Sequence, residues 1–520
     1  MRLGIDVGGT NTDAVLMHGR RVVAEAKTPT TPDVTSGIVT AIGQVMSRHQ
    51  AGEVDAVMIG TTHFTNAVVE ARHLMATAVV RLGLPATQEL PPMVDWPERL
   101  RIALGHHVYI CHGGHEFDGR HISELDPAEL IRVAEEIGRK GIRSIAISSV
   151  FSPINGEFEE EAGSVLSAAL PGVAISLSSQ IGRLGLLERE NATVLNACLR
   201  DLADHTVQAF QGAIGSAGIN APLYLSQNDG TLMAVEQARR YPVATFASGP
   251  TNSMRGAAFL TGLLDCAVID IGGTTSDVGT LQHGFPRPAS VAVEMAEVRT
   301  NFRMPDVYSF GIGGGSVVRS DGALAVGPES VGYELPTRAL CFGGQTLTAT
   351  DVAVAAGLAD VGNPALVRHL DRELVRRCLN LIQARVAQAV DRMRTSAAPI
   401  PVVVVGGGSI LLGDRLPGAS VLVRPEQFAV ANAIGAAIAQ VGGEVDQVFT
   451  LGGLSRDTAV DSAKATAVDR AVTAGADPAT VQVVDVEDVP LSYLPGNAVR
   501  VRVKAVGDLR LEAKHLATGG

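Results

Sequence analysis

Two closely similar stretches stand far apart in the chain, DVGGTNTD at residues 6–13 and DIGGTTSD at residues 270–277. A short apolar run precedes each of them and another follows, which is the pattern of two β-strands joined by a turn. Consecutive glycines let a turn bring its backbone N–H groups close to a ligand, and the neighbouring hydroxyls add further donors. Each stretch is therefore predicted to be a β-hairpin whose turn binds phosphate.

The repetition of the motif carries more weight than either copy. A single Gly-Gly-Thr is also an ordinary β-turn. Two copies, each opening an α/β segment, favour a duplication in which facing hairpins hold a nucleotide between two lobes. Asp6 and Asp270 each end the strand before the turn, where a carboxylate suits Mg²⁺ and its waters. We therefore predict that these two residues bind Mg²⁺.

Composition excludes several classes of function. The 520 residues predict two or three domains, and 46% hydrophobic residues with 57 glycines are typical of an α/β enzyme. The net charge is −12 and no Lys/Arg cluster is present, so neither a nucleic-acid nor a membrane partner is expected. The five cysteines are scattered, which predicts reduced thiols. The N-terminus enters a strand directly, and together these features predict a cytoplasmic protein.

The order of predicted elements divides the chain into three parts. Alternating strands and helices predict a first lobe over residues 1–243, including one long helix over 186–214. A second α/β lobe is expected over 244–441, closed by a helix over 425–440. The remainder, 442–520, reads as a small α+β appendage of one helix and two strands.

The motifs of this sequence resemble those of a known superfamily. The two Gly-Gly-Thr motifs look like the phosphate loops of the actin-like ATPase fold, a duplicated ribonuclease H-like α/β fold shared by sugar kinases, Hsp70 and actin, and VVVVGGGS (402–409) looks like its adenosine loop. GTTHFTNAVVEAR (60–72), RENATVLNACL (189–199) and ASGPTNSMRGAAFL (247–260) resemble ordered landmarks of the hydantoinase/oxoprolinase family. This second resemblance covers roughly residues 1–440.

The family resemblance implies an activity. Its members use ATP and Mg²⁺ to open cyclic amides such as 5-oxoproline or hydantoins, or, in relatives, to activate ketones for carboxylation. In both cases a carbonyl or enolate oxygen is phosphorylated, which requires positioning and charge neutralisation. A cyclic amide is therefore the expected substrate. The resemblance also implies a second hydantoinase-type subunit, and self-association stays open.

Two other functions compete with this interpretation. A sugar kinase also carries a D-x-G-G-T motif, although the E-x-G-H and Cys-rich motifs typical of such kinases are not found in this sequence. A nucleotide-dependent switch that signals to a partner is the alternative without enzymatic turnover of a small molecule.

Site residues follow from the turn chemistry and from the resemblance. The expected phosphate ligands are Gly8, Gly9, Thr10, Asn11 and Thr12 from the first turn and Gly272, Gly273, Thr274 and Thr275 from the second. Asp13 and Asp277 follow the turns at the same interval and either contact the nucleotide or cap the loops. Gly406, Gly407, Gly408 and Ser409 are expected near the adenosine.

The substrate side of the site is assigned to a Thr-rich turn. Thr61, Thr62, His63 and Asn66 follow a strand end, where open α/β sheets place their ligands, and the first three are predicted to be catalytic. An exposed turn residue is the alternative for His63. Asp306 precedes a Gly-rich turn and is predicted to face the same cleft, with a helix or turn cap as the equal alternative.

One histidine-rich stretch raises a separate question. GHHVYICHGGHEFDGRH (105–121) contains five histidines and one cysteine. Only Cys111 and His115 have a spacing typical of zinc ligands, and no second such pair supports them. Transition-metal binding and a glycine-rich loop that contacts substrate or a partner both remain open.

Overall fold

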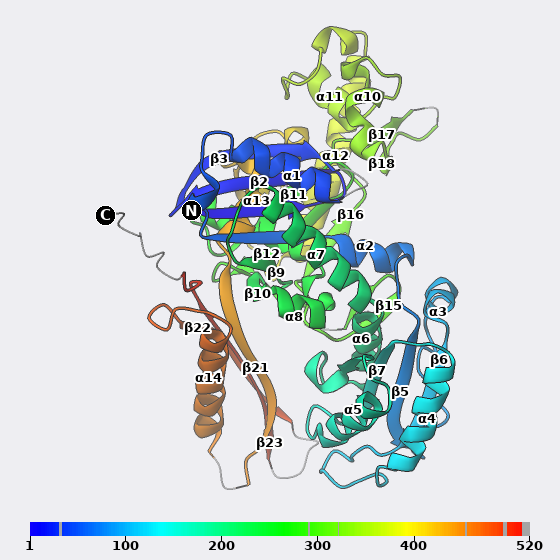
Figure 1. Cartoon of the computed structure of the whole chain (residues 1–520). Helices are drawn as coiled ribbons and strands as arrows, with labels where there is room; N and C mark the ends of the chain where they lie inside the picture. Colours follow the sequence, from blue (N-terminus) through cyan, green and yellow to red (C-terminus); the bar gives the residue numbers. More distant parts are fainter. Residues whose placement is uncertain (31–33, 290–291, 321, 453–454, 492–496, 512–520) are drawn as a thin grey trace.

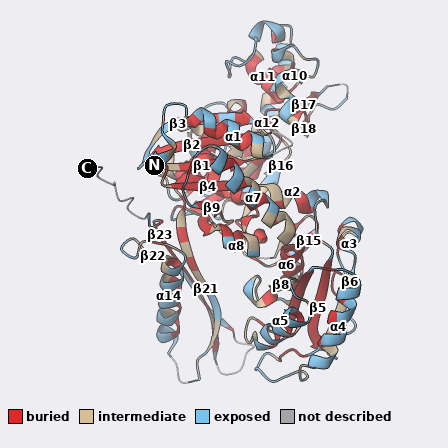
Figure 2. Ribbon diagram, viewed as in Figure 1, coloured by how far each residue is buried: buried red, intermediate tan, exposed pale blue. Residues whose placement is uncertain are grey.

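Two β-sheets carry the two hairpins (Figure 1). The computed structural model describes residues 1–30, 34–289, 292–320, 322–452, 455–491 and 497–511. The first sheet has the strand order β22-β23-β21-β10-β9-β4-β1-β2-β3, and the second has the order β13-β12-β11-β19-β20 with β16 paired to β12. Figure 2 shows that the strands at the centre of these sheets are buried, which places the core between the sheets and their helices.

The two hairpins have the same construction. In the first, β1 (Arg2–Val7) pairs antiparallel with β2 (Asn11–His18), and in the second, β11 (Cys266–Ile271) pairs antiparallel with β12 (Ser276–Gln282). Both first strands also pair in parallel with the next α/β strand, β4 (Ala56–Thr61) or β19 (Ile400–Val405). The predicted hairpins are confirmed.

The remaining strands complete the two sheets. The first sheet also contains β3 (Arg21–Pro29), β9 (Leu223–Ser226) and β10 (Thr231–Ala234). The second also contains β13 (Phe285–Pro286), β16 (Val307–Phe310) and β20 (Ala419–Val423). Helices α1 (Val34–Val45), α2 (His63–Glu70), α7 (Arg200–Ser216) and α8 (Val235–Arg240) flank the first sheet, and α12 (Arg372–Met393) packs on the second.

Two helices cross between the sheets, α9 (Ser248–Thr261) and α13 (Ala431–Ala437). The apolar side of α13 packs on the first hairpin, and that of α9 packs on the second sheet. Their backbones touch, because a Cβ on Gly256 would lie 1.9 Å from the Ala431 carbonyl oxygen and one on Gly435 would lie 1.8 Å from the Asn252 carbonyl oxygen. The expected helix over 425–440 is wrong in extent, since a 3₁₀ turn precedes α13 and a strand begins at Gln440.

A third, four-stranded parallel sheet lies within the first half of the chain, in the order β6-β5-β7-β8. Its strands are β5 (Thr77–Leu84), β6 (His107–His112), β7 (Ser144–Ser149) and β8 (Ala174–Leu177). Its helices are α3 (Glu98–Leu104), α4 (Pro127–Arg139), α5 (Glu157–Ala169) and α6 (Leu186–Cys198). The helix expected over 186–214 is in fact two helices, since α6 ends at Cys198 and α7 begins at Arg200.

The second half carries a smaller insertion of hairpins and short helices, seen at the top of Figure 1. It consists of β17 (Ser316–Arg319), β18 (Ala325–Ser330), α10 (Leu335–Arg338) and α11 (Ala349–Ala355). A further hairpin of β14 (Val293–Met295) and β15 (Val298–Thr300) lies against α6.

The C-terminal part extends the first sheet. It contains β21 (Gln440–Thr450), α14 (Arg456–Thr473), β22 (Gln482–Leu491) and β23 (Ala498–Gly507), so it has one strand more than the sequence predicts. β21 joins β10 in parallel through Thr231 and Leu232. Alanines at every fourth position of α14, from Ala459 to Ala471, are buried against the strands.

The cysteines and the helices relate to two expectations from the sequence, reduced thiols and the absence of a membrane partner. All five cysteines are free and buried. Within the described ranges, every helix is too short or too polar to cross a bilayer.

Replacing Gly435 with alanine is expected to destabilise the protein by about 1–3 kcal/mol, because the new methyl group forces α9 and α13 apart. Urea unfolding measures the effect. Gly43→Ala is the matched control, since this glycine is exposed in α1 and a Cβ there meets no atom within 4 Å. An alanine at position 435 that is tolerated as well as the control would contradict the packing of these two helices.

Candidate functional site

Carboxylates from both hairpins gather at the ends of the first strands. Asp6 lies opposite Asp13 in the first hairpin, and Asp270 lies opposite Asp277 in the second. Asp6 is 4% exposed and Asp13 is 2% exposed. Burial, the charge of Asp13 and the charge of Asp270 raise the pKa of Asp6 to about 7. The hairpins therefore bring like charges from the two halves of the chain to one place.

The carboxylates of the second hairpin are perturbed in the same direction. Burial raises the pKa of Asp270, and burial together with the charge of Asp270 raises the pKa of Asp277 to about 6. Buried carboxylates that repel one another are the donor set that a hard divalent cation relieves, since the cation satisfies the negative charge directly. The residues present thus fit the Mg²⁺ that the sequence predicts.

Side chains from the two crossing helices hold these carboxylates. Asn432 of α13 donates from its amide nitrogen to Asp6 Oδ2 at 3.0 Å and to Asp13 Oδ2 at 2.8 Å. Asn252 of α9 donates to Asp6 Oδ1 at 3.4 Å. The next residue, Ser253, donates to Asp270 Oδ2 at 2.5 Å. The two helices therefore fix the distance between the hairpins.

Sequence reasoning did not assign roles to these three residues. Asn252 and Ser253 lie within the landmark at residues 247–260, and Asn432 lies in the helix after the Gly-rich loop. The available signal was the presence of small polar residues on helices that otherwise pack tightly through alanine and glycine. Lys27 of β3 was also missed, and its amino group pairs with Asp13 Oδ1 at 2.5 Å.

The two Gly-Gly-Thr turns face each other. In each turn the first glycine donates its N–H to the residue three positions later, Gly8 to Asn11 at 3.0 Å and Gly272 to Thr275 at 2.9 Å. The turns also approach one another, because a Cβ on Gly273 would lie 3.1 Å from the Thr10 methyl carbon. The structure therefore brings together the two stretches on which the nucleotide hypothesis rests.

The Thr-rich turn adjoins the first hairpin. Gly60 pairs with Asp6 in the parallel register, and a Cβ on Gly60 would lie 2.4 Å from Asp6 Oδ1. Thr62 donates its N–H to the Val7 carbonyl at 3.3 Å. Glycine at position 60 is thus required by the close approach of the carboxylate. Thr61 ends β4, Thr62 is the residue before α2, and His63 and Asn66 lie in the first part of α2, beside the first Gly-Gly-Thr turn.

His63 is held within this turn. Its Nδ1 lies 2.9 Å from the hydroxyl of Thr61, and burial lowers its pKa. A neutral imidazole can orient a substrate or accept a proton. Asn66 is exposed one turn later on α2, and its amide donates to the Thr62 hydroxyl at 3.4 Å.

The Gly-rich loop after β19 packs against the second hairpin. Gly406 has a φ of +83°, and a Cβ there would lie 2.2 Å from Asp270 Oδ1. A Cβ on Gly408 would lie 2.7 Å from the Gly272 carbonyl oxygen, whereas one on Gly407 would meet nothing within 4 Å. Ser409 is buried. The loop is therefore close to the predicted nucleotide site, and only glycine fits at two of its positions.

A second Gly-rich loop, residues 313–315, supports the second turn in a way the sequence did not predict. Gly314 and Gly315 donate their N–H groups to the carbonyls of Gly272 and Gly273, at 3.0 and 2.7 Å. The carbonyl side of the turn is thus occupied by protein.

Asp306 is not gathered with the other predicted residues. Its carboxylate accepts a hydrogen bond from Arg287 at 2.6 Å. Arg287 lines a separate cavity of about 470 Å³, which also includes Asp229, Arg303 and Lys504. The charges there are paired within the protein, since Lys504 Nζ lies 2.9 Å from an Asp229 carboxylate oxygen.

Known proteins share both the sequence pattern and the fold. The chain is 27% identical over 471 residues to caprolactamase subunit alpha of Pseudomonas jessenii, covering 84% of this chain and 65% of that protein. It is 24% identical over 396 residues to the acetophenone carboxylase gamma subunit of Aromatoleum aromaticum, covering 68% of this chain and 53% of that one. This chain therefore spans less than two thirds of the length of either relative.

Solved structures agree with the expected fold. The crystal structure of the ATP-dependent caprolactamase from Pseudomonas jessenii superposes with a TM-score of 0.79 at 18% identity, covering 98% of this chain and 88% of that one. Nucleotide-free acetone carboxylase superposes with a TM-score of 0.68 at 15% identity, covering 99% and 88%. The predicted two-lobed α/β fold is confirmed.

Two family models cover most of the chain. Residues 2–170 match the hydantoinase/oxoprolinase N-terminal region, and residues 189–403 match hydantoinase/oxoprolinase. The resemblance noted from the motifs is thereby confirmed, and the chain belongs to the hydantoinase/oxoprolinase family.

Proposed function

We propose that this protein opens a cyclic amide in an ATP- and Mg²⁺-dependent reaction that begins with phosphorylation of the substrate's carbonyl oxygen. One observation carries the proposal: two Gly-Gly-Thr turns face each other beside a cluster of carboxylates, of which Asp6 and Asp13 are buried and Asp270 and Asp277 are half-buried. The similarity to caprolactamase subunit alpha supports a lactam-type substrate.

The two turns bind the phosphates of ATP in this proposal. The ligands are the backbone N–H groups and hydroxyls of Gly8, Gly9, Thr10, Asn11, Thr12, Gly272, Gly273, Thr274 and Thr275. Asp6 and Asp270 hold Mg²⁺, which neutralises charge on the transferring phosphoryl group. Asp13 and Asp277 act as hydrogen-bond acceptors in the strands that follow the turns, and Gly406 to Ser409 lie along the adenosine.

Residues of the Thr-rich turn act on the substrate. Thr61, Thr62 and Asn66 orient the cyclic amide, and neutral His63 orients the carbonyl or accepts a proton. An amide carbonyl is a poor electrophile, so transfer of the γ-phosphoryl group to its oxygen makes the carbon open to water and provides a leaving group. Water adds to this carbon, and the ring nitrogen takes a proton and leaves as the C–N bond breaks. A second water then hydrolyses the remaining acyl phosphate to the carboxylate and inorganic phosphate.

A partner subunit completes the proposed reaction. The two relatives described above are subunits, alpha and gamma, of larger enzymes. We propose that a second hydantoinase-type subunit supplies the hydrolytic step and that the isolated chain carries out the ATP-dependent step.

A second candidate function is supported by the other relatives. Similarity to a carboxylase subunit and to acetone carboxylase favours an ATP-dependent ketone carboxylase, in which an enolate oxygen receives the phosphoryl group. The same turns and carboxylates serve both reactions, so only the substrate separates them.

ADP release from the purified chain tests the proposal, alone and with the second subunit. The substrates are caprolactam, 5-oxoproline, hydantoin, acetone with bicarbonate, and glucose as the sugar-kinase control. Stimulation by a cyclic amide supports amide opening, and stimulation only by ketone with bicarbonate transfers the assignment to carboxylation. Formation of a sugar phosphate, or ATP turnover that no substrate changes, would overturn both.

Asp6→Asn and Asp270→Asn are each expected to lower ATP turnover by at least about 100-fold, because each removes a charge that holds the cation at the phosphates. Steady-state ADP release measures the loss. Asp265→Asn is the control, since Asp265 is exposed at the other end of β11. Retention of full turnover in either folded site variant would remove the proposed metal ligands.

The stability of the metal-free protein is expected to fall as pH rises from about 4 to 7. The folded state binds a proton at Asp6 more tightly than the unfolded state does, because the pKa is raised to about 7, so deprotonation disfavours folding. Asp6→Asn removes this effect and should be more stable than the wild type at pH 8, by up to about 4 kcal/mol, and nearly equal at pH 4.

Urea unfolding in the presence of EDTA at the two pH values measures this difference. When Mg²⁺ and nucleotide replace EDTA, the difference in unfolding free energy between the wild type and Asp6→Asn should become smaller at pH 8. If the difference in unfolding free energy between the wild type and Asp6→Asn is the same at both pH values, ionisation of Asp6 does not destabilise the folded protein and the prediction is wrong.

A further inference from the structure

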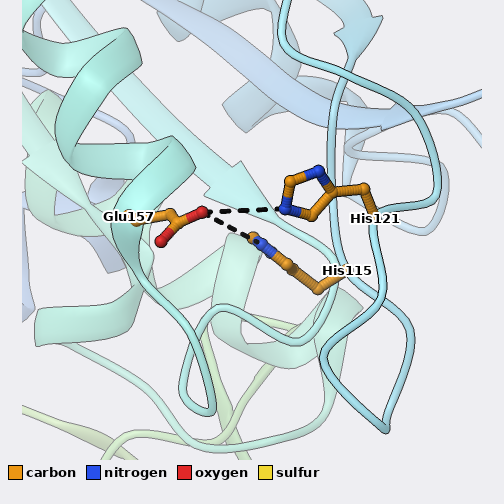
Figure 3. Close-up of side chains that lie close together, drawn as sticks. All are labelled: His115, His121 and Glu157. Carbon is orange, nitrogen blue, oxygen red and sulfur yellow. Dashed lines mark ion pairs between the residues drawn. The ribbon is translucent and has the colours of Figure 1, made fainter.

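Two imidazoles and one carboxylate converge at the edge of the third sheet, away from the phosphate turns. Nε2 of His115 lies 3.8 Å from Glu157 Oε1, and Nε2 of His121 lies 3.7 Å from the same oxygen. One ligand atom from each residue lies within 4.8 Å of the others. Figure 3 shows the three side chains pointing toward a common centre.

The backbone around this cluster is well fixed. His115 and His121 form an isolated antiparallel bridge, and Ile122 donates its N–H to the Gly114 carbonyl at 2.8 Å. Gly114 has a φ of +90°, which allows the sharp turn before His115. Glu157 begins α5, so the carboxylate comes from a separate element that packs against the loop. The geometry is set by the fold and does not depend on one flexible segment.

Aromatic packing orients the two rings. The ring of Phe158 lies 4.5 Å from that of His115 and 4.7 Å from that of His121, measured between centroids. The two imidazoles are nearly perpendicular, with centroids 5.1 Å apart. Phe158 thus forms an apolar wall behind the cluster, and the nitrogen atoms face Glu157.

Hydrogen bonds outside the cluster favour ligand-competent imidazoles. Nδ1 of His121 lies 2.9 Å from Glu124 Oε1, which leaves its Nε2 toward Glu157 as the atom with a lone pair. A carboxylate bound to the far nitrogen is typical of metal-binding histidines. His115 is fully buried, and its Nδ1 has no hydrogen-bond partner among the described residues. Nε2 of His115 lies 3.3 Å from the Asn155 amide nitrogen, a donor that a metal ion bound at Nε2 would displace.

From this geometry we propose that His115, His121 and Glu157 bind a divalent transition-metal ion of the Zn²⁺ type. Two nitrogen ligands and one oxygen ligand suit zinc and its neighbours, whereas Mg²⁺ and Ca²⁺ take oxygen ligands. Bonds of about 2.0–2.2 Å in a tetrahedral site place ligand atoms roughly 3.4 Å apart, so the separations of 3.8 and 3.7 Å between the histidine nitrogens and Glu157 Oε1 need to contract by only a few tenths of an ångström. The ligand atoms of the two imidazoles lie within 4.8 Å of each other.

Exposure indicates where the fourth ligand enters. The side chain of His115 is 1% exposed, that of His121 is 36% exposed and that of Glu157 is 58% exposed. The ion therefore sits at the surface with one position open to water. It ties the loop after β6 to the start of α5, and it is independent of the proposed ATP site.

The sequence indicated residues 105–121 as a possible metal-binding stretch but did not identify these three ligands. Cys111 and His115 had the expected spacing, yet Cys111 lies in β6 and does not belong to the cluster. His112 is paired with Glu129 at 3.2 Å. The third ligand, Glu157, is distant in sequence, so no local spacing could reveal it.

Zinc binding by the full chain is the test. Protein stripped with EDTA and dialysed against Zn²⁺ should retain one equivalent of zinc, measured by elemental analysis. With Co²⁺ it should show visible absorption bands of a nitrogen- and oxygen-ligated ion. His121→Ala and Glu157→Gln should each weaken the affinity by at least about 100-fold, and Glu124→Gln by about 10-fold.

His112→Ala is the matched control, since it removes an exposed histidine of the same stretch that lies outside the cluster. Zinc should raise the melting temperature of the wild type and of this control, but not that of His121→Ala. In EDTA all three proteins should have the same melting temperature. Turnover of ATP by His121→Ala should equal that of the wild type. Equal zinc uptake by wild type and His121→Ala, or no uptake by the wild type, would overturn the proposal.

Discussion

Repulsion between the carboxylates of the two hairpins, buried in the first and half-buried in the second, is the constraint on which the arrangement of the lobes depends. Asp6 and Asp270 are brought together although the charge of Asp270 raises the pKa of Asp6 and the charge of Asp13 raises the pKa of Asp270. Amide and hydroxyl donors from α9 and α13 offset part of this cost, and those donors reach the carboxylates only because the helices touch at Gly256 and Gly435. A pair of glycines thereby determines the spacing of the two turns, as well as the packing of the helices.

The C-terminal strands add a second connection between distant parts of the chain. Lys504 of β23 pairs with Asp229, which follows β9, and Arg303 from the second half pairs with Glu444 of β21. Burial opposes ionisation of Asp229, but the charge and hydrogen bond of Lys504, a hydrogen bond from Thr231 and the charge of Arg303 lower its pKa to about 2. Removing one member of such a buried pair leaves an uncompensated charge, which is costly. The tail is thus integrated into the first sheet and its charge network, although its composition alone resembles an appendage.

Sequence reasoning succeeded where the signal was local and repeated. The hairpins were predictable because a turn of two glycines between apolar runs has few alternative structures, and the repeat identified both lobes. The third sheet was not predictable, because alternation of strands and helices gives no information about which strands pair. The residues that hold the carboxylates, Asn252 and Asn432, were missed for a related reason: they act through contacts between helices 180 residues apart in the chain. The length of α13 was overestimated because an alanine-rich, apolar run favours a helix. In the structure the last residue of that run, Gln440, pairs in strand β21 instead.

The charge of the site explains why a divalent cation is expected to accompany the nucleotide. Asp6, Asp13, Asp270 and Asp277 lie around the facing turns, and the identified cation beside them, Lys27, is already paired with Asp13. A triphosphate would bring further negative charge to a place where carboxylates already hold protons more tightly than usual. Backbone N–H groups of the turns carry only partial charges and cannot balance both sets of anions. A divalent cation held by these carboxylates would lower the repulsion among them and toward the phosphates. Nucleotide affinity and metal affinity should therefore be coupled, and the coupling follows from the same carboxylates that make the metal-free site unfavourable.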